Sequence, residues 1–422
     1  MRIAGLLSLA GGAVLTLAPA AAAVPGDLDP AFSSDGKVTT DVTSGVDIGV
    51  GVAIQGDGKI VVAGEVAGGG GRLGLTRYNE DGSLDTSFSA DGKLTTNFTS
   101  GDDVASDVVI QPDGKIVAAG RAGGSGGQFA VARYNADGTL DSSFSGDGKQ
   151  TTNFTSGNDW AFGLALQADG KIVAVGRAAG AGGRFAVVRY NADGTLDAGF
   201  SSDGKVATDF TSGFDIADHV AIQPADEKIV AVGTADYMRS TARFALARYN
   251  TDGTLDPAFA GDGKVTTNFT SGFDGGFAGA VQIGDGKIVA VGQAGSRMGV
   301  ARYNTNGTLD ASFSADGKVA TNFTVGSDYA DDVVIQADGK IVGVGAANYF
   351  GSNANFALAR YNANGSLDAT FSSDGKQTTS FTSRRDLGYG AAIDGAGKVV
   401  VAGGSGIGGS NPKFAVARYL AD

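Results

Sequence analysis

Residues 133–149 read RYNADGTLDSSFSGDGK, and residues 189–205 read RYNADGTLDAGFSSDGK. The tyrosine of this phrase occurs seven times at intervals of 54–59 residues: Tyr78, Tyr134, Tyr190, Tyr249, Tyr303, Tyr361 and Tyr419. The phenylalanine of its FSxDGK ending also occurs seven times, at Phe32, Phe88, Phe144, Phe200, Phe259, Phe313 and Phe371. A regular period of this length indicates stacked supersecondary units that bury their faces against one another.

Each copy predicts four β-strands. In the second copy they are DVVIQ (107–111), KIVAAG (115–120), FAVARYN (129–135) and KQTTNF (149–154), all rich in strand-forming residues. The segment KIVAVG is apolar on both faces, which predicts sheets that are covered on both sides. We therefore expect an all-β fold, a seven-bladed β-propeller of four-stranded antiparallel blades, with a β-solenoid as the alternative.

The two ends of the chain are expected to close the ring. The N-terminal strand around residues 37–42 is of the fourth type and has no earlier partner in its own copy. The C-terminal strand at 414–419 is of the third type and has no successor. Pairing the two would complete the seventh blade and remove two open sheet edges.

The recurring DGKIVAVG…RFAVARYNADGTLD…FSGDGK pattern resembles the bacterial delta-60 repeat, and more distantly the NHL-type propeller repeats. The resemblance covers residues 28–419. It implies a β-propeller, and the family brings no established catalytic residues to carry over.

Composition limits the classes of partner and chemistry. The formal net charge is −13 and no basic cluster occurs, so we expect no nucleic-acid partner. The absence of cysteine excludes disulfides, thiolate catalysis and cysteine-based metal sites.

A basic start, an apolar run at 3–17 and Ala21-Ala22-Ala23 predict a signal peptide, residues 1–23. Residues 24–422 would then form one propeller domain, secreted or periplasmic, without a membrane span and monomeric.

Residues present in every copy are interpreted as serving the blade. Arg133, Asp141 and Lys149 have counterparts in all copies, which favours turn capping and ion pairing between neighbouring blades. One aspartate also precedes each first strand: Asp47, Asp103, Asp159, Asp215, Asp274, Asp328 and Asp386. Seven carboxylates near a channel mouth could bind Ca²⁺, the one cofactor considered, or could instead bond to the backbone of their own turns.

Residues that differ between copies are the better candidates for function. His219, the only histidine, starts the first strand of the fourth copy. The aligned residues elsewhere are Gly51, Asp107, Gly163, Gly279, Asp332 and Gly390. Trp160, the only tryptophan, lies beside this ring and could stack on a sugar. The alternative for both residues is ordinary packing.

The links between second and third strands vary most in length. From the glycine that ends the second strand to the repeat tyrosine, the fifth copy has 11 residues and its two neighbours have 16. The fourth link carries Tyr237, Met238 and Arg239, and the sixth carries Tyr349 and Phe350. A notch between two aromatic walls would suit a binding site, whereas mobile loops with incidental aromatic residues are the alternative.

No strong catalytic motif occurs, and no catalytic residue is assigned. We expect an exported, non-enzymatic propeller that binds a protein or glycan or acts as a surface scaffold. The alternative is a hydrolase or lyase acting on a glycan, ester or lactone, with or without a requirement for calcium, and with aspartates as acid and base.

Overall fold

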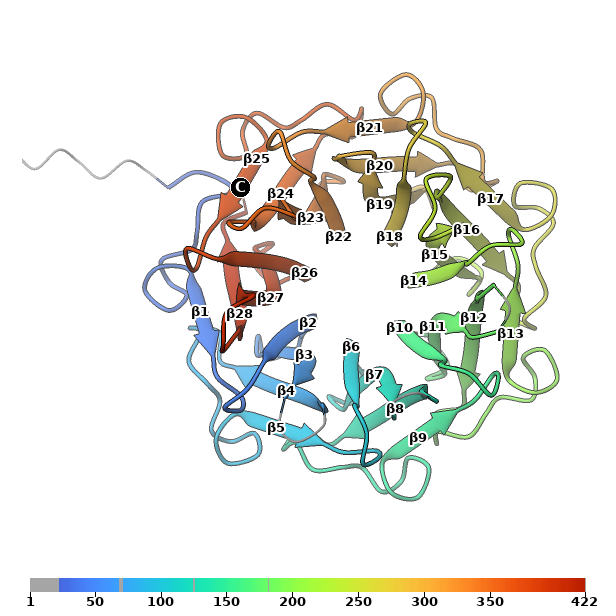
Figure 1. The fold of residues 1–422 in the computed structure, drawn as a ribbon, viewed down its shortest axis with the longest axis horizontal. Helices are drawn as coiled ribbons and strands as arrows, with labels where there is room; N and C mark the ends of the chain where they lie inside the picture. Colours follow the sequence, from blue (N-terminus) through green and yellow to red (C-terminus); the bar gives the residue numbers. More distant parts are fainter. Residues whose placement is uncertain (1–22, 68–70, 124–125, 181, 422) are drawn as a thin grey trace, which may run out of the picture.

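The fold is a seven-bladed β-propeller. The computed structural model describes residues 23–421 apart from 68–70, 124–125 and 181, and all regular elements in these ranges are β-strands (Figure 1). They form seven four-stranded antiparallel sheets arranged as blades around a central axis, as the repeat predicts. In the same ranges no helix is long and apolar enough to cross a membrane. Except for Ala23, the predicted signal peptide lies outside the described residues.

Each blade runs from an innermost to an outermost strand. The innermost strands are β2 (Asp47–Ile54), β6 (Val104–Ile110), β10 (Trp160–Leu166), β14 (Ile216–Ile222), β18 (Asp274–Val281), β22 (Tyr329–Ile335) and β26 (Arg385–Ile393). The second strands are β3 (Ile60–Val66), β7 (Ile116–Ala122), β11 (Ile172–Ala178), β15 (Ile229–Ala235), β19 (Ile288–Ala294), β23 (Ile341–Ala347) and β27 (Val399–Ile407). The third strands are β4 (Arg72–Tyr78), β8 (Gln128–Tyr134), β12 (Arg184–Tyr190), β16 (Arg243–Tyr249), β20 (Arg297–Tyr303), β24 (Asn355–Tyr361) and β28 (Lys413–Tyr419). The outermost strands are β5 (Lys93–Thr96), β9 (Lys149–Thr152), β13 (Lys205–Thr208), β17 (Lys264–Thr267), β21 (Lys318–Thr321), β25 (Lys376–Thr379) and β1 (Lys37–Thr40).

The seventh blade mixes the two ends of the chain, which confirms the predicted closure. Its strand order is β1-β28-β27-β26, and β1 pairs antiparallel with β28 from Lys37↔Ala417 to Thr40↔Phe414 (Figure 1). The Arg418 Nε donates to Asp29 Oδ2 at 2.7 Å, so the recurring arginine–aspartate pair also forms across the two ends.

The hydrophobic core lies between blades rather than within them. One buried cluster contains Val117, Phe129 and Phe144 of the second repeat and Ala161 of the third blade. Six similar clusters lie at the other junctions between blades. Each repeat tyrosine is fully buried, and its hydroxyl bonds to a threonine on the outermost strand of the preceding blade, as Tyr134 does to Thr96 at 2.8 Å. No blade can therefore bury its faces alone.

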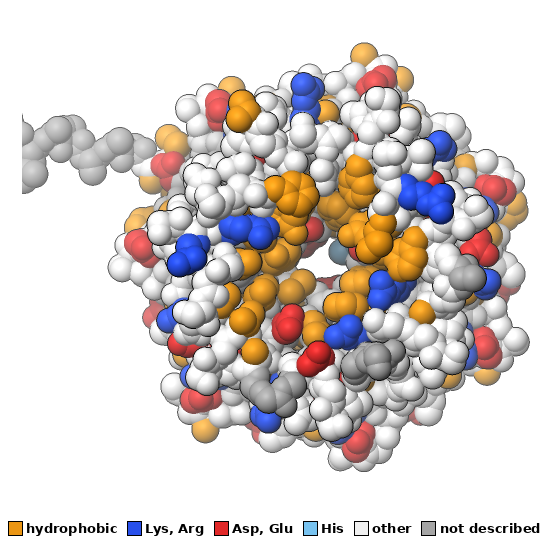
Figure 2. Space-filling model, in the orientation of Figure 1, with side chains coloured by type: hydrophobic (Ala, Val, Ile, Leu, Met, Phe, Trp, Pro, Cys, Tyr) orange, Lys and Arg blue, Asp and Glu red, His pale blue; other side chains and the backbone are white. Residues whose placement is uncertain are grey.

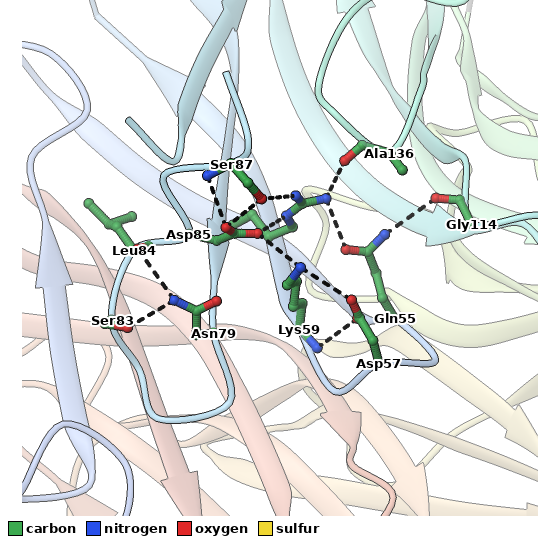
Figure 3. A network of polar contacts seen from close by, with 11 residues as sticks. Gln55, Asp57, Lys59, Asn79, Ser83, Leu84, Asp85, Ser87, Gly114 and Ala136 are labelled. Carbon is green, nitrogen blue, oxygen red and sulfur yellow. Dashed lines mark hydrogen bonds and ion pairs between the residues drawn. The ribbon is translucent and has the colours of Figure 1, made fainter. Parts of the chain in front are cut away.

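A polar network recurs where each third strand ends (Figure 3). In the first blade Arg77 Nε donates to Asp85 Oδ2 at 2.8 Å, and Arg77 Nη1 contacts the carbonyl of Ala136 in the second blade. Gln55 Nε2 donates to the carbonyl of Gly114, also in the second blade, at 3.3 Å. The arginine and aspartate thus pair within one blade, whereas the sequence predicted ion pairing between neighbouring blades. Hydrogen bonds to carbonyl oxygens join neighbouring blades instead. The Phe88 ring also lies at this junction, under the Arg77 guanidinium, whose central carbon is 4.7 Å from the ring centre.

Candidate binding site in the central channel

The seven link aspartates accept hydrogen bonds from the backbone of their own turns, as Asp103 illustrates. Asp103 Oδ2 accepts hydrogen bonds from the backbone N–H of Phe98 and Thr99, and its Oδ1 accepts from Thr99 Oγ1 and Gly123 N–H. The Asp103 N–H donates to the carbonyl of Gly71 in the preceding blade. These bonds tie the segment before the first strand to loops between second and third strands, so both kinds of connection lie on one face of the propeller.

This bonding matches the turn interpretation of the seven aspartates. All seven side chains are fully buried. Across the described ranges no set of three histidine, aspartate or glutamate side chains is arranged to hold a metal ion. The calcium hypothesis stays a prediction, and the hydrogen bonds account for the aspartates without it.

Each innermost strand carries a β-bulge near its start, and this bulge turns side chains toward the central channel. Pairing between the first two strands of each blade shifts by one residue, for example between Ala217 and His219 in the fourth. The extra residues at this step are Val50, Ser106, Phe162, Asp218, Phe277, Asp331 and Tyr389. A bulge places two successive side chains against one partner residue and re-aims them. Both residues of such a pair can therefore face the channel.

The channel holds a cavity of about 540 Å³ lined by these strands. Its walls include Trp160, Asp218, His219, Phe277 and Asp331. The walls differ from blade to blade, although the blades themselves repeat. The cavity is therefore the part of the fold where the sevenfold pattern is broken.

The residues after the bulge form a ring that joins neighbouring inner strands. Asp107 Oδ2 accepts from Leu164 N–H in the next blade at 2.8 Å, and Asp332 Oδ2 accepts from Ala391 N–H at 2.7 Å. Burial raises the pKa of Asp107 to about 6 and that of Asp332 to about 7. The strand register places Ala278 in this ring, so the expectation of Gly279 was wrong by one residue.

His219 belongs to the same ring. Burial lowers the pKa of its imidazole, and the negative charge of Asp107 and a hydrogen bond to the backbone of Gly279 oppose that shift. The imidazole is therefore neutral at pH 7. Its Nδ1 is buried and has no hydrogen-bond partner.

Asp218 and Asp331 lie at the bulge step of the fourth and sixth blades, on either side of the blade that carries Phe277. Burial raises the pKa of Asp218 well above its usual range, and the charge of Asp331 raises it further. Burial likewise raises the pKa of Asp331, although a hydrogen bond with the side chain of Tyr329 opposes the shift. One oxygen of each carboxyl, Oδ2, is buried without a hydrogen-bond partner.

Aromatic side chains surround the mouth of this cavity. Figure 2 shows hydrophobic side chains gathered around the central opening, with charged side chains among them. The Tyr329 ring packs edge-on against Phe277 and Tyr349, with ring centres 5.9 and 4.7 Å apart. Three arginines stack on rings of the same mouth: Arg121 on Trp160 at 4.3 Å, Arg177 on Phe214 at 5.4 Å and Arg385 on Tyr349 at 4.9 Å.

The predicted notch residues divide into two groups. Tyr237 packs against Phe214 and Phe273, and Tyr349 against Tyr329, so both tyrosines belong to the mouth. Met238 and Phe350 are each 77% exposed, and Arg239 is also exposed. In the fifth blade, which lies between the blades of these two groups, the connection from the second to the third strand is a tight turn, because β19 ends at Ala294 and β20 begins at Arg297.

Comparison with known proteins identifies the kind of repeat. Six segments match the family model described as "Domain of unknown function (DUF5122) beta-propeller", at residues 55–88, 111–144, 167–200, 225–259, 284–313 and 336–371. The chain is a β-propeller repeat protein. The seventh copy of this segment is divided between the two ends of the propeller, where Leu28 pairs with Tyr419 as Leu84 pairs with Tyr78. A comparison with curated protein sequences finds no significant match.

Solved propellers share the fold at low sequence identity. Selenomethionine-substituted virginiamycin B lyase from Staphylococcus aureus is 11% identical, with a TM-score of 0.56 over 90% of this chain and 98% of that chain. A catalytically inactive variant of that lyase with quinupristin is 10% identical, with a TM-score of 0.54 and the same coverage. At these identities the likeness establishes the architecture alone.

Some of the residues that the sequence singled out lie at this cavity. His219 and Trp160 line the cavity as their positions suggested, and Tyr237 and Tyr349 lie at its mouth. Asp218 and Asp331 were missed. The signal was present, since each replaces an apolar or small residue of the other copies, but simple alternation assigns only one of two successive residues to the channel.

Proposed function

We propose that this protein is an exported, non-enzymatic binding propeller that receives a small ligand in its central cavity. The observation that supports this most is the cavity of about 540 Å³, a size typical of small-molecule sites. It combines an aromatic mouth with buried polar atoms that lack partners, as binding sites do when a ligand supplies the missing contacts. A larger protein or glycan partner would contact the exposed Met238, Arg239 and Phe350 of the same face.

A thermal-shift screen of small molecules tests this proposal when it includes a variant with a filled cavity. Val50 lines the cavity, so Val50→Trp should occupy it. Val325 is fully exposed, and Val325→Trp is the matched control. We expect compounds that raise the Tm of the wild type and of Val325→Trp but not of Val50→Trp. Stabilising compounds that act equally on all three proteins, or an absence of stabilising compounds, would count against a cavity site.

An enzyme acting on a glycan, ester or lactone is the second candidate. Asp107 and Asp332, with pKa values of about 6 and 7, titrate near neutral pH in the same cavity as His219, as acid–base residues must. Nitrophenyl esters, nitrophenyl glycosides, a lactone and virginiamycin B, each with and without calcium, are suitable substrates for a first assay. Turnover that disappears in Asp332→Asn would replace the binding proposal with this one.

Export is supported by the basic start and apolar run of residues 1–17 and by the small residues before Val24. N-terminal sequencing of protein from the culture medium or periplasm should begin at Val24. Protein that retains Met1 inside the cell would contradict export.

A further inference from the structure

The two unpartnered carboxyls of the cavity indicate the chemistry of its ligand. We propose that the cavity binds an organic cation, a primary or quaternary ammonium group on an apolar body, whose charge is held by Asp218 and Asp331. This inference rests on the cavity being the ligand site.

The first argument is the absence of a balancing positive charge. Neither Asp218 nor Asp331 forms an ion pair with any arginine, lysine or histidine of the described ranges. Burial raises the proton affinity of both carboxyls; the charge of Asp331 raises that of Asp218 further, and the charge of Asp332 raises that of Asp331. A buried carboxylate without a countercharge is strongly unfavourable, so each group keeps a proton until a cation replaces it. The unpartnered Oδ2 atoms are the acceptors that a primary ammonium group would use, and the carboxylate charge would attract a quaternary one.

The second argument is the aromatic surface around this pair. Phe277 lies on the blade between Asp218 and Asp331, and the side chain of Tyr329 bonds to Asp331. Burial raises the pKa of Tyr389 and of Tyr237; the charge of Asp331 raises both further, and the charge of Asp218 also raises that of Tyr237. Ring faces attract organic cations, and most strongly where water is excluded. Rings also receive the apolar body of the ligand.

Other ligand classes fit these walls less well. A hard metal ion requires six or more oxygen ligands, whereas the described residues contain no three-carboxylate metal group. An anion would meet no lysine or arginine among the residues that line the cavity, and Asp107, with a pKa of about 6, is negatively charged at pH 7 and would repel it.

The remaining charged groups lie at the rim. Arg121, Arg177 and Arg385 stack on aromatic rings there, and none of them contributes to the charge balance of Asp218 or Asp331. Glu65 lies beside Arg121, whose charge opposes the increase in the Glu65 pKa that burial causes. His219 is neutral at pH 7. The charged side chains at the rim therefore do not neutralise Asp218 and Asp331, which stay available to a cation that enters the cavity.

Calorimetric titration with four probes of similar size tests the assignment. Benzyltrimethylammonium and phenethylamine are cations, benzyl alcohol is neutral and phenylacetate is an anion. We expect the two cations to bind, with proton release at pH 7 detectable by comparing phosphate and Tris buffers. Because a hydrogen bond to a charged group is worth roughly 10–100-fold in affinity, Asp218→Asn with Asp331→Asn should weaken phenethylamine binding by about that factor. The same variant should also weaken the binding of benzyltrimethylammonium, which has no N–H to donate and depends on the carboxylate charge alone.

The matched control replaces two exposed aspartates that each stand just before an outermost strand, Asp262→Asn with Asp316→Asn, and it should leave binding unchanged. The Asn pair at 218 and 331 resembles the protonated acids in shape and charge, so its Tm should stay near that of the wild type, which separates lost binding from lost fold. Equal binding of the neutral or anionic probe, or cation binding that survives the Asn pair, would overturn the inference. If Val50→Trp still blocked such binding, the cavity would remain the site and only the cation assignment would fail. If no probe bound, the cation assignment would be rejected, and the screen described above would decide the proposed function.

Discussion

Replacing Phe32 by alanine measures how strongly the N-terminal segment closes the ring. Phe32 is fully buried in the cluster between the seventh and first blades, and its ring lies 5.0 Å from the Arg418 guanidinium. Truncating a buried phenylalanine costs about 3–5 kcal/mol. Unfolding entropy is about 2.1 cal/mol/K per residue, or about 0.8 kcal/mol/K for a chain of about 400 residues, so the Tm should fall by about 4–6 °C.

The repeat supplies a matched control for this experiment. Phe200 is the equivalent residue between interior blades, also fully buried, and 4.7 Å from the Arg189 guanidinium. Calorimetry should give similar decreases in Tm for Phe32→Ala and Phe200→Ala. A decrease below about 1 °C for Phe32→Ala beside a full decrease for Phe200→Ala would refute closure by the N-terminal segment. Deleting residues 24–45, which removes β1 and the Asp29 partner of Arg418, should destabilise the whole ring, and a truncated protein that melts like the full one would refute closure independently.

Four further predictions follow from the site and the junctions. Burial raises the pKa of Asp107 to about 6 and that of Asp332 to about 7, so between these values and pH 4 the folded protein holds protons that the unfolded chain has released. The free energy of unfolding should therefore fall as pH rises from about 4 to 7, and a Tm that rises over this range would contradict this prediction. The pKa of Asp141 is lowered to about 2, so its contribution should be lost as pH falls below about 4, and Asp141→Asn should cost about 3 kcal/mol in denaturant unfolding by leaving its arginine unpaired. Tyr237→Ala with Tyr349→Ala should weaken benzyltrimethylammonium binding about tenfold without loss of strand signal in circular dichroism, and unchanged affinity would remove the mouth from the site. Millimolar calcium should leave the Tm unchanged if the backbone groups that already bond to the link aspartates are their only partners, whereas a specific increase in Tm would support the calcium hypothesis.

The fold could be predicted from the sequence because every level of the repeat agrees. The same turn phrase, the same strand lengths and the same two-sided apolar runs occur seven times, so local errors in one copy are corrected by the others. Closure was also predictable, since the chain starts with an unpaired fourth strand and ends with an unpaired third strand.

The site was less predictable because it depends on departures from the repeat and on one backbone irregularity. His219 and Trp160 stand out by rarity. Asp218 and Asp331 are ordinary aspartates in an aspartate-rich chain, and the bulge that turns them into the channel has no residue signature of its own. The regular spacing of the link aspartates left two interpretations open, a metal ring and bonding to the backbone of their own turns, and the structure places backbone N–H groups around each of them.

The fluorescence of Trp160 tests the central claim most directly, because it is the only tryptophan and it lines the cavity. Its indole Nε1 donates to Ser106 Oγ at 3.0 Å and its ring lies under Arg121, so a ligand that enters the mouth should change its emission. Titration with benzyltrimethylammonium should give a saturable change with the same midpoint as calorimetry, and the change should be lost in the variant carrying Asp218→Asn and Asp331→Asn. Calorimetric binding with unchanged Trp160 emission would place the ligand outside the channel and contradict the account.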